Sequence, residues 1–200
     1  MTTPNKPGHQ PDVAAASLLH DLRALTPDRQ LSHLERLRLA EWQATALRHM
    51  LGVTEDRFPI HLLRDIPRVC VRTVDDLPVS GLTFWGGHTW KIQIRSEESL
   101  THRRFTVLHE FKHIIDHPVC GRLYDERAYV AAGERELVAD HFASCVLLPA
   151  KNLKTACDTT ADRRELAQQF GVSRRQIALR MAELGLSSVD TPPITERRIT

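Results

Sequence analysis

The sequence has no apolar run that approaches the about 18 residues of a membrane-spanning helix. Its first twelve residues, MTTPNKPGHQPD, contain three prolines and lack the apolar core of a secretory signal. Cysteine is scarce and forms no CxxC pair, which favours free thiols in a reducing compartment over a disulfide framework. These absences predict a cytoplasmic protein without a membrane partner. The four cysteines are Cys70, Cys120, Cys145 and Cys157.

Net charge is also small, because 27 Lys and Arg against 25 Asp and Glu leave a formal charge of +2. A balance so close to zero gives no global argument for binding nucleic acid or a membrane surface. The 200 residues, 42% of them hydrophobic, suffice for one core of ordinary size. Histidine is abundant by comparison, with 11 in the chain. Since histidine is the commonest metal ligand, the cluster within residues 102–117 directs attention to that segment.

Hydrophobic spacing divides the chain into five segments. Residues 1–12 and 189–200 are polar and contain proline, and we expect them to be disordered tails. Residues 13–52 are expected to form helices, since apolar residues recur at intervals of three and four. Residues 53–150 combine period-two alternation with two strong helical patterns, and residues 151–188 have a helix-turn-helix-like pattern. The predicted fold class is α+β, mostly helical with a small three-stranded sheet.

Local signals predict where the elements begin and end. Thr26-Pro27 is a cap-and-proline signal for the start of the second helix, and Gly52 can close that helix in the left-handed conformation. Gly86-Gly87-His88 is a hairpin signal between two strands. A loop is expected over residues 118–131. The expected helices include about 13–25, 99–117, 132–147 and a stretch from 161, and the expected strands lie around 69–71, 82–85 and 89–94.

The segment His109-Glu110-Phe111-Lys112-His113 is an HExxH motif inside a predicted helix. Residues four apart lie on one helix face, so the imidazoles of His109 and His113 can bind one Zn²⁺. Glu110 then lies near the open coordination position, where it can act as general base on the water that the metal activates. The alternative is a histidine pair on a helix surface with no metal.

A catalytic zinc needs a third protein ligand and one open position. His117 follows His113 at the same interval of four residues. It lies about 12 Å along the helix axis from His109, however, which is too far for the two to share an ion. Glu136 and Asp140 are better placed, one turn apart on the next predicted helix, where one can bind zinc and the other can hold a ligating imidazole by its free N–H. Glu134, on another face, is a competing candidate. The same helix has four apolar residues expected to face the core: Leu137, Phe142, Cys145 and Val146.

Residues 163–186 have the spacing of a helix-turn-helix pair, with Ser173 as cap of the second helix. Arg174, Arg175 and Arg180 can meet phosphates, which makes a DNA-binding regulator the rival hypothesis. We favour a pair that packs on the catalytic core or docks the substrate, because its basic excess is modest. Direct binding of nucleic acid is therefore the less favoured interpretation.

These motifs together resemble the ImmA/IrrE family of metallopeptidases over roughly residues 35–186. The resemblance rests on three stretches, which are Arg103-Arg104-Phe105-Thr106 before the HExxH motif, Glu136-x-x-Ala139-Asp140-x-Phe142-Ala143, and Leu147-Leu148-Pro149. It implies a minimal zincin-like catalytic domain over residues 53–150. It also implies site-specific cleavage of a helix-turn-helix transcriptional repressor of the Cro type, in a mobile element or a stress response.

Carried over by motif position, His109, His113 and Glu136 would be the zinc ligands and Glu110 the base. The chain departs from the family pattern at two positions, since Lys112 stands where glycine is common and Val138 where a second glutamate is common. Neither change removes a ligand, but Lys112 brings local packing, metal affinity and activity into question. A zinc sensor without turnover therefore stays as a further alternative. The group that stabilises the oxyanion is left open among Tyr124, Tyr129 and His141.

Overall fold

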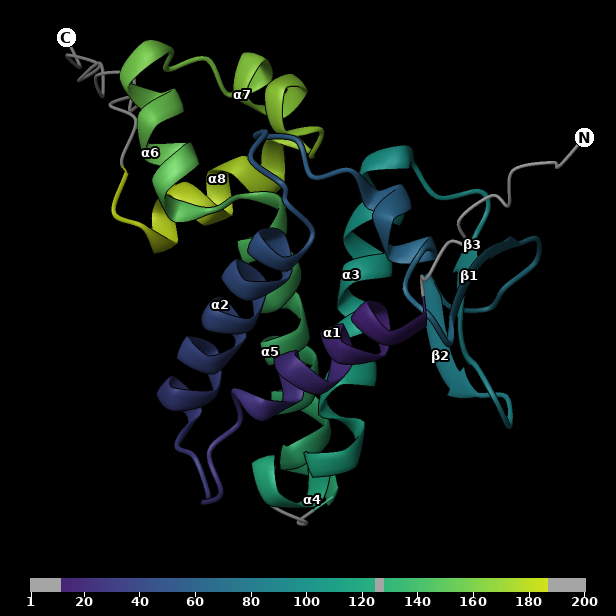
Figure 1. Cartoon of the computed structure of the whole chain (residues 1–200). Coiled ribbons are helices and arrows are strands. Elements are labelled where there is room, and N and C mark those ends of the chain that lie inside the picture. The colour runs from purple at the N-terminus through teal and green to yellow at the C-terminus, as the bar shows by residue number, and fades with distance from the viewer. Residues whose placement is uncertain (1–11, 125–127, 187–200) are drawn as a thin grey trace, which may run out of the picture.

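The computed structural model describes residues 12–124 and 128–186 (Figure 1). It is mostly helical with one three-stranded sheet, which confirms the predicted α+β class. None of the described helices is both long and apolar enough to cross a membrane. The predicted disordered tails lie outside the described residues, apart from Asp12. The elements are α1 (Asp12–Ala24), α2 (His33–Met50), η1 (Ile60–Arg64), β1 (Val69–Val74), β2 (Gly81–Trp85), β3 (Trp90–Arg95), α3 (Leu100–Asp116), η2 (His117–Val119), α4 (Cys120–Leu123), α5 (Ala128–Leu147), α6 (Ala150–Thr159), α7 (Arg163–Phe170) and α8 (Arg174–Glu183).

Three helices form the centre of the fold, with α5 packed against both α2 and α3 (Figure 1). Their contacting sides are buried, as at Leu47 of α2, Phe111 of α3 and Phe142 of α5. Burial of an apolar side chain of this size contributes about 1.5–3 kcal/mol relative to exposure. α1 packs against both α2 and α3. The core therefore fixes α3 and α5, the two helices that carry the predicted site residues, next to each other.

The sheet has the strand order β1-β3-β2 and packs on α3. β3 is parallel to β1 and antiparallel to β2, so that Val71 and Thr83 both lie opposite Ile92. Ile92 and Ile94 are buried and join the sheet to the helical core. The predicted glycine turn connects β2 and β3, with Gly87 at φ +86°. β2 is left at the edge of the described sheet, beside α3.

The second helix begins later than the Thr26-Pro27 signal predicted. α2 starts at His33, where Ser32 and Glu35 form a capping box. The Ser32 N–H donates to the Glu35 carboxylate, and the Glu35 N–H donates to the Ser32 hydroxyl. The box satisfies two backbone donors at the helix start, which explains why the chain turns helical there and not after Thr26.

The expected loop over 118–131 is also wrong, because it contains residues of η2, all of α4 and the first turn of α5. The helix α6 was not predicted at all. Pro118 lies at the start of η2, and Pro149 is the N-cap of α6. Since proline has no N–H to lose, it is tolerated in the first turn of a helix. Each proline therefore follows the end of one helix and starts the next.

The C-terminal pair α7–α8 packs on the core, at the top of Figure 1. Gly171 ends α7 at φ +67°, and Ser173 caps α8 as predicted. Arg180, however, is not available to phosphates, since only 2% of it is exposed. Its guanidinium donates to the Leu148 carbonyl and to the Glu41 and Glu183 carboxylates, which join α8 to α2 and to the end of α5.

Candidate metal centre

α3 presents His109 and His113 on one face, one turn apart. Ser99 caps the first turn of the helix, and the buried side chains of Phe111 and Ile115 hold its other face in the core. The two imidazoles therefore point to the same side. Their Nε2 atoms lie 3.1 Å apart.

α5 brings two carboxylates to the same point. Glu136 Oε2 lies 3.0 Å from His109 Nε2, and Glu136 Oε1 lies 3.4 Å from His113 Nε2. Asp140, one turn further along α5, accepts a 2.8 Å hydrogen bond from Nδ1 of His109. The structure thus brings together all four residues that the two motifs singled out for metal binding and support.

The spacing of these donor atoms fits one metal ion. Ligand atoms at about 2.0–2.1 Å from a tetrahedral zinc lie about 3.3 Å from one another. The two Nε2 atoms lie 3.1 Å apart, and the Glu136 carboxylate lies 3.0 Å from His109 through Oε2 and 3.4 Å from His113 through Oε1. Because Nδ1–H of His109 donates to Asp140, its Nε2 is left with a lone pair for a metal.

The carboxylates attract positive charge to this point. Burial disfavours the charged form of His109, but hydrogen bonds with Asp140 and Glu136 outweigh it and raise the pKa of His109 to about 9. Hydrogen bonds from His109 and His113 hold the pKa of Glu136 far below its usual range. A metal ion can supply the same positive charge in place of a proton.

Glu110 lies beside this group, at the edge of a cleft of about 410 Å³ that His113 and Glu136 also line. It is only 7% exposed. Burial raises the pKa of Glu110 in spite of the two nearby histidines, which lower it. A carboxyl with a raised pKa is suited to accepting and returning a proton near neutral pH.

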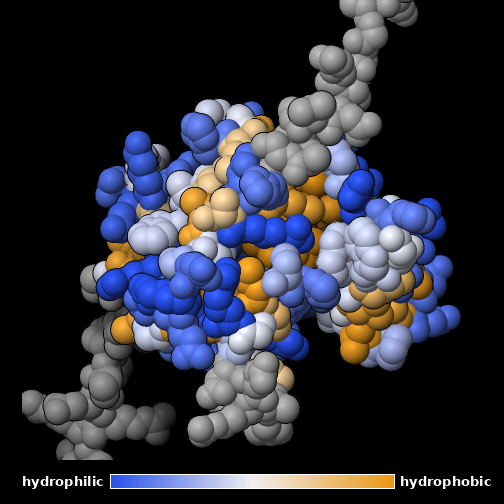
Figure 2. Space-filling model, turned by 60° about the horizontal axis from the view of Figure 1, so that its bottom comes forward, coloured by the Kyte–Doolittle hydropathy of each residue, from blue (hydrophilic) through white to orange (hydrophobic). Residues whose placement is uncertain are grey.

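The cleft runs between the sheet and the helices. Residues 81–83 of β2 line one part of it, and Cys120, Tyr124 and Arg135 line another. Figure 2 views the bottom of Figure 1, where the strand-containing part projects on the right and apolar surface lies between it and the helical part. A peptide that enters the cleft would therefore pass beside the edge strand β2.

Gly81 is a site residue that sequence reasoning missed. A Cβ at this position would lie 2.4 Å from Cγ2 of Thr106 and 3.2 Å from the Glu110 side chain. Only glycine lets β2 approach α3 and Glu110 this closely. No local signal could have found it, because the contact joins residues far apart in the chain.

Substitution of Gly81 by alanine is expected to displace Glu110 and to lower the rate of any hydrolysis that uses Glu110 as its base by up to about 10²-fold, since a small misplacement of such a group has this cost. Gly133→Ala is the matched control, because its added Cβ meets nothing within 4 Å. Steady-state cleavage rates of the two variants measure the difference. Equal rates for both would show that the close approach of β2 does not position Glu110.

The two other candidate ligands, His117 and Glu134, lie outside the group, and one residue expected in the core is exposed. His117 stacks edge-on against Trp90 at 4.8 Å between ring centroids, as expected from its distance along the helix. Glu134 is held by Arg36 and by Nδ1 of His33, and not by the histidines of α3. Leu137 was expected in the core and is 59% exposed, since it lies on the outer side of α5 next to a second cavity.

Lys112, which departs from the family pattern, is fully buried and is not among the residues that line the cleft. Its ammonium donates to Gln43 Oε1 at 2.7 Å and to Asp116 Oδ1 at 2.5 Å. The Tyr124 hydroxyl donates to the other oxygen of Asp116 at 2.7 Å. Burial lowers the pKa of Lys112, against the opposing effect of Asp116. The lysine thus fills the space behind the histidines with a satisfied polar network. Val138 is buried in the core.

Of the candidates for the oxyanion stabiliser, Tyr124 lines the same cleft as His113 and Glu136. The hydroxyl of Tyr124 is engaged by Asp116, and burial raises its pKa. His141 lies on another face of α5, where its Nε2 is 3.5 Å from Sγ of Cys145. The side chain of Tyr129 lies outside the described part of the chain. Arg135, which sequence reasoning did not consider, lines the cleft next to Glu136.

Comparison with known proteins gives two findings. The family described as the IrrE N-terminal-like domain, a peptidase family, matches residues 67–182. A solved structure of a transcriptional regulator from Mycobacterium tuberculosis is similar, with a TM-score of 0.58 and 17% identity over 87% of this chain and 52% of that chain. This chain therefore spans about half the length of that regulator, and the likeness concerns the fold alone. No curated protein matches.

Proposed function

Because this chain belongs to the family of the IrrE N-terminal-like domain, a family of metallopeptidases, we propose that it is a metal-dependent endopeptidase. One observation carries the proposal. The donor atoms of His109, His113 and Glu136 lie within 4.8 Å of one another, beside a cleft that His113, Glu136 and Glu110 line. We propose these three residues as ligands of one zinc ion and Glu110 as the general base.

Glu110 and Asp140 have different roles in the proposed hydrolysis. A bound metal would polarise the scissile carbonyl and make a water molecule more acidic. Glu110 accepts the proton from the attacking water and returns it to the leaving amine. Asp140 holds Nδ1–H of His109, so that Nε2 keeps its lone pair for the metal.

The edge strand β2 offers a way to hold the substrate. It has a neighbouring strand on one side only within the described sheet, and its first residues line the cleft beside Glu110. An extended peptide can add to such an edge through backbone hydrogen bonds, with pockets for alternate side chains. We propose a segment of a helix-turn-helix repressor of the Cro type as the substrate.

The proposal is tested with purified protein and a Cro-type repressor from the same genome. Zinc-loaded protein is expected to cut the repressor at one bond, and chelator-treated protein is expected to leave it intact until one equivalent of zinc is restored. Gel electrophoresis and intact-mass measurement follow the products. Cleavage that persists after chelation contradicts a metal enzyme, and bound zinc without any cleavage favours the zinc sensor instead.

A second candidate function, DNA binding, is favoured by a separate observation. Arg163 and Arg164 of α7 and Arg174 and Arg175 of α8 line a surface groove of about 940 Å³. Guanidinium groups in such a groove suit phosphates. Against this function, Arg180 is buried and α8 packs on the core.

DNA binding predicts a duplex affinity that falls steeply with salt. Replacing both Arg174 and Arg175 by alanine should then lower the slope of log K against log salt by about 2, because two phosphate contacts are lost. Lys151→Ala with Lys154→Ala is the control, since both lysines are exposed on α6, outside the groove. Fluorescence anisotropy measures the affinities. If replacing both arginines leaves the affinity for duplex DNA unchanged, this function is rejected.

A further inference from the structure

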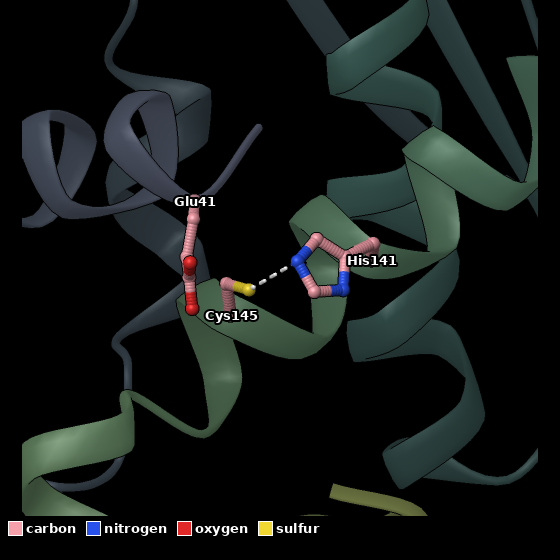
Figure 3. Close-up of side chains that lie close together, drawn as sticks. All are labelled: Glu41, His141 and Cys145. Atoms are coloured by element: carbon pink, nitrogen blue, oxygen red, sulfur yellow. Dashed lines mark hydrogen bonds between the residues drawn. The ribbon is translucent and has the colours of Figure 1, made fainter. Parts of the chain in front are cut away.

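A second group of metal-type donors lies on another face of α5 than Glu136 and Asp140. His141 and Cys145 are one turn apart on α5, and Glu41 reaches toward them from α2 (Figure 3). Nε2 of His141 lies 3.5 Å from Sγ of Cys145, and one donor atom of each of the three residues lies within 4.8 Å of the other two. Two packed helices thus hold an imidazole, a thiol and a carboxylate at one point.

The donor set and its spacing suit zinc. Zinc takes cysteine sulfur at about 2.3 Å and histidine nitrogen at about 2.0–2.1 Å, so the two ligand atoms of a tetrahedral site lie about 3.6 Å apart. The observed separation of 3.5 Å between His141 and Cys145 already has this value. Glu41 has only a short movement to make, because its carboxylate lies within 4.8 Å of both.

The charges around Glu41, His141 and Cys145 can accommodate a divalent cation, although the guanidinium of Arg180 lies nearby. The guanidinium lies 3.3 Å from one oxygen of Glu41 and 2.9 Å from Glu183, and the described residues leave the other oxygen of Glu41 unbonded. Two carboxylates and one guanidinium leave one negative charge beside the neutral thiol. A divalent ion that displaces the Cys145 proton to solvent brings the sum of charges to zero, because the thiolate adds the second negative charge.

Solvent can reach the group. A cavity of about 340 Å³ opens beside it, lined by His141, Ser144 and Glu183 among others. Cys145 itself is only 4% exposed. An ion can therefore enter from the His141 side and be shielded from solvent on the sulfur side.

We propose that Glu41, His141 and Cys145 bind a second zinc ion, with water or Glu183 completing the tetrahedron. The ion links α2 to α5 at the point where Arg180 of α8 also docks, so its role is structural. This site is separate from the catalytic one and does not depend on the proposed peptidase activity.

Cobalt(II) tests the proposal, because a thiolate ligand gives it an intense near-ultraviolet charge-transfer band that a site with two histidines and a carboxylate lacks. The full chain, stripped of metal, is titrated with Co²⁺ and separately with Zn²⁺, and bound metal is measured by mass spectrometry. Wild-type protein is expected to bind two equivalents and to show the thiolate band. The double variant His109→Ala/His113→Ala should bind one equivalent and keep the band.

Cys145→Ser is expected to lose the band and one equivalent, whereas Cys157→Ser, which alters a cysteine on α6, should keep both. Circular dichroism shows whether each variant is folded. The proposal can be overturned even if Cys145→Ser does not fold. Wild-type protein that shows no thiolate band at two equivalents of cobalt contradicts it. One equivalent with the band supports this site and contradicts the catalytic one, so the two proposals fail separately.

Discussion

Replacing Lys112 by methionine is expected to lower the free energy of unfolding by about 3–5 kcal/mol, because it leaves the carboxylate of Asp116 buried without its cation. Lys112 and Asp116 are both buried, and the lysine also bonds to Gln43 of α2. For a chain of this size the loss corresponds to a fall in Tm of about 6–20 °C. Thermal unfolding followed by circular dichroism measures it.

Two further variants separate the buried network from a general effect of removing a lysine. Lys154→Met removes an exposed lysine of α6 and is expected to change stability by less than about 0.5 kcal/mol. The double variant Lys112→Met/Asp116→Asn should recover part of the loss, since no charge is then left unpaired. If Lys112→Met is as stable as the wild type, the network does not hold the helices behind the histidines.

Replacing Glu110 by glutamine is expected to lower the cleavage rate by about 10²- to 10⁴-fold while metal binding stays unchanged. Glutamine has nearly the shape of glutamate but cannot accept the proton of the attacking water. Burial and the close packing of Gly81 keep the side chain in place, so the loss reports proton transfer and not misplacement. Single-turnover cleavage and metal content, measured on the same preparation, give the two quantities.

Glu97→Gln is the control for this substitution, because Glu97 is exposed and lies outside the cleft. It is expected to cleave at the wild-type rate. A Glu110→Gln protein that retains full activity would assign the base to another group. A variant that loses its metal would instead show that Glu110 supports the ligands.

Much of the candidate site could be predicted because its signals are local. His109 and His113 lie on one face of α3 because residues four apart in a helix are about one turn apart. Glu136 and Asp140 repeat that spacing on α5, and both lie within hydrogen-bond distance of His109. The exclusion of His117 followed from helix rise alone.

What the sequence could not predict depends on contacts between distant segments. Gly81 meets Glu110 across 29 positions, and Lys112 finds its amide partner Gln43 on α2. Arg180 has the charge of a phosphate-binding residue, yet it is buried and donates a hydrogen bond to the Leu148 carbonyl. Such pairings appear only when helices pack, because each partner alone fits an ordinary surface position.

The central claim is that this cleft hydrolyses a peptide bond, and mass spectrometry in ¹⁸O-enriched water tests it most directly. The zinc-loaded protein is incubated with the proposed substrate, a Cro-type repressor from the same genome, and the products are weighed intact. Two fragments are expected whose masses add up to the repressor plus one water, with ¹⁸O in the new carboxyl group, and no such fragments are expected with Glu110→Gln. Fragments from both proteins, or an intact repressor with the zinc-loaded wild type, would contradict it.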